Sequence, residues 1–403
     1  MARRSLVSLV VLAFAAGCAA QGAPEPGRPV SEIGTAHHHQ HTHANVIASR
    51  VLDFPDTADG RKVLAVDLHT HSVFSDGHVW PTVRTWEAER DGLAAFAVTE
   101  HLEYQPHRDD IPHPDRNRSF ELAAQSALED GDGLIVIPGV EVTRKLPPGH
   151  VNAVFIRDAN PILTIDSWDQ DHIENARVAL KEAQGQGAFT FWNHPYWERD
   201  FPNGVLVVPD AQKRLVHDGL INGIEVANGR DFSEETYRYA LDEGLVILGT
   251  SDIHGLIDYD YDIDAGEHRT VTLALAKERS AEGIKNALIA GDTTALFMGN
   301  IIGRQEQVEA VVLAALHVTL GPGPEGTKTV SVTIRNDAPV RMMLNNLGAR
   351  KFRDSGDLVI LPPNSERTLV LTGGAEQEGV TLPVEVLNAY VGPQQKLRTE
   401  LKP

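Results

Sequence analysis

Cysteine is almost missing from this chain of 403 residues, in which Cys18 is the single example. One thiol excludes any disulfide within the chain, even in an oxidising compartment. Metal ligation, if present, would therefore rest on histidine and carboxylate side chains rather than on thiolates.

Positive charge is also scarce. The chain has 36 Lys and Arg residues against 56 Asp and Glu residues, which gives a formal net charge of -20 and a pI near 5.3. Such a chain repels polyanions at long range, and no stretch of the sequence suggests a basic groove, so we expect no nucleic-acid partner. Bound metal ions would offset the negative charge locally, which matters for an anionic substrate.

The apolar run over 6–16 is too short to span a membrane as a helix. It follows Arg3 and Arg4 and precedes small residues, a pattern typical of a signal peptide over 1–17. The Gly17-Cys18 junction resembles a bacterial lipobox, although Ala15 stands where leucine is more usual. We expect an exported, periplasmic protein with a lipid anchor to the membrane on Cys18. An ordinary signal peptide followed by a coincidental cysteine is the alternative.

The segment 18–50 is typical of a flexible tether, because residues 21–31 are rich in Pro, Gly and Ala. Five histidines follow within it. They are candidates either for metal capture outside the cytoplasm or for an incidental polar linker, and they are His37, His38, His39, His41 and His43.

The stretch 63–77 organises the rest of the chain. Residues 63–66 are apolar and β-branched in part, which predicts a buried strand. Because residues two apart in a strand point to the same side, His69 and His71 can aim two imidazoles at one point beyond its end. Gly77 permits the sharp turn that brings Asp76 back over the same rim.

Apolar strands alternate with helical patterns through 51–304, which predicts a parallel β/α architecture. Polar residues follow one strand after another, and in a β/α barrel such strand ends converge on one face. This convergence, rather than any single histidine, predicts the site. The residues that recur after the strands are His69, His71, Asp76, His101, Glu141, His194, Asp252 and His254.

The sequence pattern changes at 305–403, where short β-type runs alternate with Gly, Pro, Asn and Asp turns. No strong helix is visible there. We predict a small antiparallel β-sandwich that serves as a packing or spacing module. A module that binds a partner or a glycan is the alternative.

With His150, which precedes the mostly apolar run 151–156, the candidates are six imidazoles and three carboxylates. On one rim they suit two or three divalent ions, which would be Mn, Zn or Fe. Acid–base chemistry and a purely structural network are the other tasks that such residues can perform. Ions that share a carboxylate can hold a bridging hydroxide and clamp an in-line displacement at phosphorus.

Six short motifs also carry a resemblance to a known family. Over about 63–295 the chain resembles the PHP (polymerase and histidinol phosphatase) metallophosphoesterases. The motifs stand in the family's order, each after the corresponding element: HTHSVFSDG, TEH, GVEV, GHVN, NHP and SDIH. The resemblance implies a distorted (β/α)7 barrel with a trinuclear metal site.

Carrying the family's ligands over by motif assigns three groups. The first ion would take His69, His71, Glu141 and Asp252. The second would share Glu141 and add His150 and His194, and the third would take Asp76, His101 and His254. Many members have a histidine where this chain has Asp76, a difference that bears on the preference of the third ion.

The resemblance implies that a hydroxide bridging the first two ions attacks phosphorus while the third ion binds phosphate oxygens. Asp252 and His194 are our candidates for catalysis beyond ligation. Asp67 and Glu100 would orient imidazoles, or else cap nearby backbone. Arg144 and Arg269 could meet a phosphate oxygen, and the alternative is a solvated surface charge for each.

We expect a small-molecule phosphate ester as substrate, with a phosphodiester favoured over a phosphomonoester. Trp192, Tyr196 and Trp197 would form an apolar wall for the ester group, or else pack in the core. The loop 104–119 is long enough for a lid. Three readings compete: a phosphomonoesterase, a non-catalytic metal-binding lipoprotein, and a barrel hydrolase acting on C–N or C–O bonds. The oligomeric state stays open.

Overall fold

The structure is a computed structural model that describes residues 51–165, 173–197, 201, 203, 205–353, 355–374 and 378–403. The signal peptide, the tether and Cys18 lie outside the described residues, so the predictions made for them stay predictions. None of the helices in the described ranges is both long and apolar enough to cross a membrane.

Strands of the first domain are the short apolar runs of the sequence, buried on both faces. β1 (Lys62–Asp67), β2 (Ala95–Val98) and β3 (Ile135–Val142) are parallel neighbours. β5 (Phe189–Trp192), β6 (Gly223–Asn228) and β8 (Val246–Thr250) form a second parallel run, and β7 (Asp231–Phe232) makes a hairpin with β6. β4 (Val151–Val154) lies between the two runs, and β9 (Val271–Ala276) pairs with β1.

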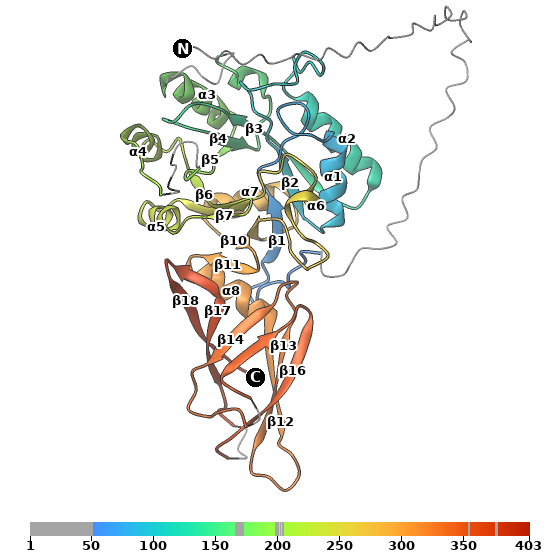
Figure 1. Ribbon diagram of the computed structural model, residues 1–403, viewed down its shortest axis with the longest axis vertical. Helices are drawn as coiled ribbons and strands as arrows, with labels where there is room; N and C mark the ends of the chain where they lie inside the picture. The colour runs from blue at the N-terminus through green and yellow to red at the C-terminus, as the bar shows by residue number, and fades with distance from the viewer. Residues whose placement is uncertain are drawn as a thin grey trace, which may run out of the picture. The chain divides into compact units, whose positions relative to one another are not determined.

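The helices begin and end where the sequence supplies capping residues. Ser233 and Ser280 accept hydrogen bonds from backbone N–H groups one turn into α5 and α7. Gly131 ends α2 with a φ of 77°. Figure 1 shows α1 and α2 side by side next to β2. The helices of this domain are α1 (Pro81–Arg90), α2 (Arg118–Asp130), η3 (Asn160–Ile162), α3 (Ile173–Gly185), α4 (Asp210–His217), α5 (Glu234–Asp242), α6 (Ile257–Asp260) and α7 (Ala281–Ala290).

The sheet is mixed rather than uniformly parallel, which corrects the predicted parallel architecture. β4 is antiparallel to both neighbours. It cannot be parallel to β3, because the connection 143–150 is too short for the crossover that parallel strands need. β9 is likewise antiparallel to β1. Beyond the strands, Thr70 and Ile253 form a parallel bridge that brings the ends of β1 and β8 together. The finer prediction of a (β/α)7 barrel stays a prediction.

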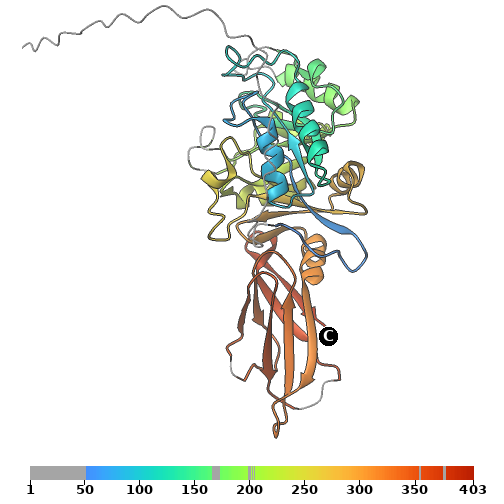
Figure 2. The same ribbon diagram turned by 90° about the vertical axis from the view of Figure 1, so that its right-hand side faces the viewer.

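The C-terminal domain consists of antiparallel strands in two layers, as the sequence predicts (Figures 1 and 2). One layer contains β12 (Leu316–Pro322), β13 (Val330–Asn336) and β16 (Ser365–Leu371). The other contains β14 (Met342–Asn346), β15 (Leu358–Leu361), β17 (Leu382–Gly392) and β18 (Gln395–Leu401). Alternate residues of each strand face a shared core.

Two elements join this domain to the first. The hairpin of β10 (Thr293–Phe297) and β11 (Asn300–Gly303) extends the central sheet from β9, and β11 pairs with β17 in parallel. A fifteen-stranded sheet therefore runs through both domains. α8 (Gln305–Ala315) packs into the same core. The expectation of no strong helix after 305 was wrong, because a helix buried on most of its faces shows little amphipathic pattern.

Candidate metal centre

His69 and His71, which follow β1, meet as the strand geometry predicts. Their Nε2 atoms lie 3.0 Å apart, and each is 3.1 Å from Oδ1 of Asp252. Oε2 of Glu141 lies 3.4 Å from the Nε2 atom of His69 and 3.3 Å from that of His71. Three segments far apart in the sequence thus bring two imidazoles and two carboxylates to one point.

Glu141 is the centre of the cluster. Its carboxylate is fully buried near the end of β3. Oε2 also lies 2.8 Å from Nδ1 of His101, while Oε1 lies 2.8 Å from Nδ1 of His150 and 3.7 Å from Nε2 of His194. One carboxylate therefore contacts five imidazoles, a position from which its two oxygens can serve different ions.

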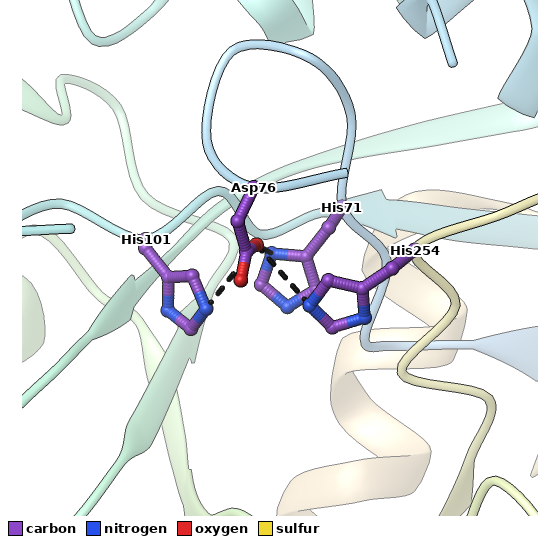
Figure 3. A group of neighbouring side chains, drawn as sticks. All are labelled: His71, Asp76, His101 and His254. Carbon is purple, nitrogen blue, oxygen red and sulfur yellow. Dashed lines mark ion pairs between the residues drawn. The ribbon is translucent and has the colours of Figure 1, made fainter. Parts of the chain in front are cut away.

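A further group surrounds Asp76 (Figure 3). Its Oδ1 atom lies 3.4 Å from Nε2 of His101 and 3.1 Å from Nε2 of His254. The rings of His71 and His254 stack with centroids 4.4 Å apart. Figure 3 shows the carboxylate pointing between His101 on one side and the stacked pair on the other. The carboxylate of Asp76 thus lies among the imidazoles of His71, His101 and His254.

Two of these residues have unusual backbone conformations. His194 and Asp252 have φ values of 26° and 50°, in the left-handed region that is costly for residues with a Cβ. Backbone hydrogen bonds hold both: Asp252 N donates to His69 O at 2.9 Å, and His194 N donates to Oε2 of Glu225 at 2.6 Å. These backbone conformations direct both side chains toward the cluster.

Glu225 is a functional residue that the sequence reasoning missed. It lies fully buried on β6, and its Oε1 atom is 2.7 Å from Nδ1 of His69 and accepts a hydrogen bond from Thr250. A carboxylate at Nδ1 fixes the tautomer of the ring and leaves the Nε2 lone pair for a metal. The signal was present in the sequence as one acidic residue inside the apolar strand GIEVAN.

Asp67 and Glu100 bind backbone and hydroxyl groups rather than imidazoles. Asp67 accepts hydrogen bonds from Ser251 N at 3.1 Å and from Ser251 Oγ at 2.6 Å. Glu100 accepts one from Ser72 N and another from Ser75 Oγ, which itself lies 3.2 Å from Nδ1 of His71. The capping alternative holds for Asp67, and Glu100 reaches His71 only through a serine.

The donor atoms fit divalent ions. Glu225 contacts Nδ1 of His69, Ser75 contacts Nδ1 of His71, and the carbonyl of Asp252 contacts Nδ1 of His254. The Nε2 atom of each ring is therefore left facing the cluster. Imidazole nitrogen and carboxylate oxygen together suit Zn, Mn or Fe. Three overlapping groups have ligand atoms within 4.8 Å of one another: His71, Asp76, His101 and His254; His69, His71 and Glu141; His101, Glu141 and His150.

The charges of the cluster are strongly coupled. Burial opposes ionisation of Glu141, but His101, His150 and His69 hold the pKa of its carboxyl well below the ordinary value. Burial likewise opposes protonation of His69, yet Asp252, Glu225 and Glu141 raise its pKa well above 6.5. Burial dominates at His150, where it lowers the pKa to about 4. Ionised carboxylates crowded against imidazoles form a site in which metal cations can replace protons.

Arg144 and Arg269 are not among the residues that line the cavity, which argues against the expectation that they contact phosphate. Both guanidinium groups are buried. Arg144 pairs with Glu103 and donates to the carbonyl of Thr143 at 2.8 Å. Arg269 donates to Oδ2 of Asp91 at 2.9 and 2.7 Å. Each arginine compensates a buried carboxylate, so neither is available to a substrate.

Arg84 of α1 links two ligand-bearing loops through their backbone. Its guanidinium donates to His71 O at 2.8 Å, to His254 O at 2.8 Å and to Ile253 O at 3.2 Å. Glu87 accepts from Arg84 at 2.6 Å and from Ile257 N at 2.8 Å. One helix therefore sets the spacing between the loop after β1 and the loop after β8.

A cavity of about 550 Å³ opens beside the cluster. Trp197 lies on its wall, with ring centroids 5.4 Å from His194 and 5.6 Å from His150. Tyr196 also lines the cavity, whereas Trp192 is only 1% exposed and packs in the core. Of the three aromatic residues predicted as an apolar wall, two therefore face the cavity. The lining residues are Asp76, His101, His150, His194, Tyr196, Trp197, Asn228, Asp231, Phe232, Asp252 and His254.

Comparisons with known proteins agree with the fold described above. A two-domain protein of Bacteroides vulgatus, described as containing a predicted PHP-like metal-dependent phosphoesterase, is 37% identical and superposes with a TM-score of 0.76. The match covers 87% of this chain and 98% of that one. Residues 318–402 match an Ig-like domain family, which agrees with the predicted sandwich.

Two other matches are more limited. A protein of Bifidobacterium adolescentis, described as a putative metal-dependent phosphoesterase, is 16% identical with a TM-score of 0.34, covering 49% of this chain and 90% of that one. An uncharacterized protein of Methanocaldococcus jannaschii is 32% identical over 85 residues, which are 21% of this chain and only 36% of that protein's length. With the first match extending over most of both chains, the protein belongs to the family of PHP-like metal-dependent phosphoesterases.

Proposed function

We propose that this protein hydrolyses small organic phosphodiesters with two or three divalent ions. The observation that carries the proposal is the convergence of nine ligand-type side chains beside an open cavity. The proposed ligands are His69, His71, Asp76, His101, Glu141, His150, His194, Asp252 and His254.

The proposed roles of the side chains follow from their positions. Bound ions supply an activated water and neutralise phosphate charge. Glu141 spans two ligand groups through its two carboxylate oxygens. Six proposed ligands also line the cavity, and they are Asp76, His101, His150, His194, Asp252 and His254. Among them we propose Asp252 and His194 as the residues closest to the reacting atoms. Glu225 keeps His69 oriented toward the ions.

The cavity favours a diester over a monoester. Among the described residues that line it there is no lysine or arginine, so a monoester dianion would depend on the ions alone for neutralisation. A diester carries one negative charge and a second organic group. Trp197 and Phe232 offer apolar surface to that group.

The test compares bis(p-nitrophenyl) phosphate with p-nitrophenyl phosphate. The protein is stripped of metal and reloaded with Mn or Zn, and bound metal is counted before each assay. We expect faster turnover of the diester and loss of activity in His71→Ala and Glu141→Ala. His217→Ala is the matched control, because this histidine on α4 is 92% exposed and is not among the residues that line the cavity.

Other outcomes separate the alternatives. Faster turnover of the monoester would keep the site and change the substrate class. No turnover of either ester with two or three ions bound would favour the metal-binding lipoprotein instead.

We also propose export and lipidation at Cys18, on the sequence pattern of residues 1–18 alone. Metabolic labelling with radioactive palmitate tests this. We expect label in the membrane fraction for the native chain and none for Cys18→Ala.

A further inference from the structure

One wall of the cavity contains none of the proposed metal ligands. It comprises Tyr196, Trp197, Asp231 and Phe232. The hydroxyl of Tyr196 donates to the carbonyl of Asp231 at 3.0 Å, which joins the loop after β5 to the β6–β7 hairpin. Trp197 N donates to the carbonyl of His194 at 2.9 Å. This wall is therefore tied to a proposed metal ligand at one end and carries a carboxylate at the other.

The Asp231 carboxylate is exposed, and within the described ranges no cation pairs with it. The adjacent Arg230 is engaged elsewhere. Its guanidinium donates to Glu267 at 2.7 and 3.1 Å and to the carbonyl of Asp260 at 2.7 Å. Asp231 thus contributes a negative charge to the cavity that Arg230 does not compensate.

A carboxylate beside aromatic rings is suited to an ammonium group. Aromatic faces attract cations through the ring quadrupole, and a nearby carboxylate adds a direct charge interaction. The metal ligands define where a phosphate would lie, and the aromatic wall begins next to His150 and His194. An ester alcohol that extends past Trp197 and the adjacent Tyr196 would lead toward Asp231, whose carbonyl accepts from the Tyr196 hydroxyl.

We propose that the substrates are phosphodiesters in which one ester alcohol carries an ammonium group. The inference rests on the proposed phosphodiesterase function and adds the charge of the organic group. Such a diester has no net charge, because its phosphate anion is balanced by the ammonium. It is therefore not repelled by a protein with a formal net charge of -20.

Two diesters that share a leaving group test the proposal. One is p-nitrophenyl phosphorylcholine, and the other is 3,3-dimethylbutyl p-nitrophenyl phosphate, in which carbon replaces the charged nitrogen. With the metal-loaded protein we expect kcat/KM for the choline ester to be about tenfold higher, mostly through a lower KM. Both esters release p-nitrophenolate, so the ratio reports recognition of the charge alone.

Asp231→Asn and Trp197→Leu should each reduce this ratio at least threefold. Asp242→Asn is the matched control, because it removes an exposed carboxylate from the end of α5, outside the cavity lining. Metal content is measured for every variant, since neither substitution should change it.

The possible results distinguish the ammonium preference from the proposed phosphodiesterase function. Equal kcat/KM for the two esters, or a ratio that survives both cavity substitutions, would overturn the ammonium preference and leave the phosphodiesterase intact. No turnover of either diester by metal-loaded protein would overturn the proposed function and the inference together.

Discussion

At the scale of single residues, the orientation of the proposed ligands depends on Glu225 as much as on the ligands themselves. Its two oxygens contact four groups: His69 Nδ1 and Thr250 Oγ1 at Oε1, and His194 N and Asn228 Nδ2 at Oε2. A buried carboxylate with four hydrogen-bonding contacts is well satisfied and holds two proposed ligands at once.

Glu225→Gln should weaken metal binding. An amide presents one oxygen and one NH2 group, so its NH2 group would face donors such as His194 N or Thr250 Oγ1. We expect affinity for Zn or Mn to fall about 10- to 100-fold, measured by competition with a chromogenic chelator. Glu243→Gln, at an exposed site after α5, is the control. Unchanged affinity in the Glu225 variant would contradict this role.

Glu89 offers a test of pH dependence away from the metal centre. Burial, together with Asp130 and Asp132, raises the pKa of Glu89 from 4.5 to about 7. The folded state therefore holds this proton more tightly than the unfolded state does, so stability falls as the pH rises from 4.5 to 7. Above pH 7 the full free-energy cost of ionising Glu89 in the folded state is present, and below pH 4.5 this cost is absent.

Glu89→Gln should accordingly raise the Tm at pH 8, and the gain should shrink as the pH is lowered to 5. Thermal unfolding followed by circular dichroism at several pH values measures this. Glu129→Gln, at an exposed position on α2, should show no such trend. A gain that is the same at pH 5 and pH 8 would rule out titration of Glu89 as the cause.

At the scale of elements, α1 acts as a brace between the loop that follows β1 and the loop that follows β8. Arg84 binds three carbonyls of these loops and is itself 2% exposed. The loops carry His71 and His254, whose rings stack at 4.4 Å. The helix thus contributes to the site without providing a ligand.

Arg84→Lys should damage this brace while keeping the positive charge. A lysine cannot reach three carbonyls with the same planar geometry, and a buried carbonyl left without a donor costs about 1–3 kcal/mol. We expect the free energy of unfolding in urea to fall by about 2–4 kcal/mol and bound metal to decrease. Arg118→Lys on the exposed face of α2 provides the comparison, and equal behaviour of the two variants would argue against the brace.

Most elements of the first domain follow from local sequence. Apolar runs gave the strands, and Pro81, Ser233 and Ser280 marked the starts of three helices. The direction of β4 and the existence of α8 did not follow. Strand direction depends on which neighbour a segment pairs with, and α8 is stabilised by burial between two domains rather than by an amphipathic pattern.

At the scale of the whole molecule, the two domains share a sheet and a hydrophobic core. β11 pairs with β17, and one cluster of buried residues contains Leu296 of the first domain together with Val311 of α8 and Val386 of the sandwich. The hydroxyl of Tyr237 donates to Gly303 O at 2.6 Å and lies 3.2 Å from Tyr390 O across the junction. Such a junction couples the unfolding of one domain to that of the other.

Calorimetry should therefore show one unfolding transition. Tyr237→Phe should lower the free energy of unfolding by about 1–2 kcal/mol, because the buried carbonyl of Gly303 loses its side-chain donor, and the transition should stay single. Tyr259→Phe is the control, since that ring is 80% exposed. Two separate transitions in the native chain would show that the domains unfold independently.

The sequence by itself determined which ligand-type side chains stand near the strand ends and the order in which they occur. His69, His71, Glu141 and Asp252 each stand just after or near the end of an apolar strand, and strand ends are fixed by local patterns. The sandwich was equally visible, because short β-type runs alternate with Gly, Pro, Asn and Asp turns over 305–403.

Tertiary structure alone decided which atoms meet. Glu225 faces His69 across 156 positions of sequence, and the pairing of Arg269 with Asp91 spans 178. Neither contact leaves a trace in local periodicity, so Glu225 was overlooked and Arg269 was assigned to the substrate. Charge compensation in a buried interior depends on which side chains folding brings together, and spacing along the chain does not encode it.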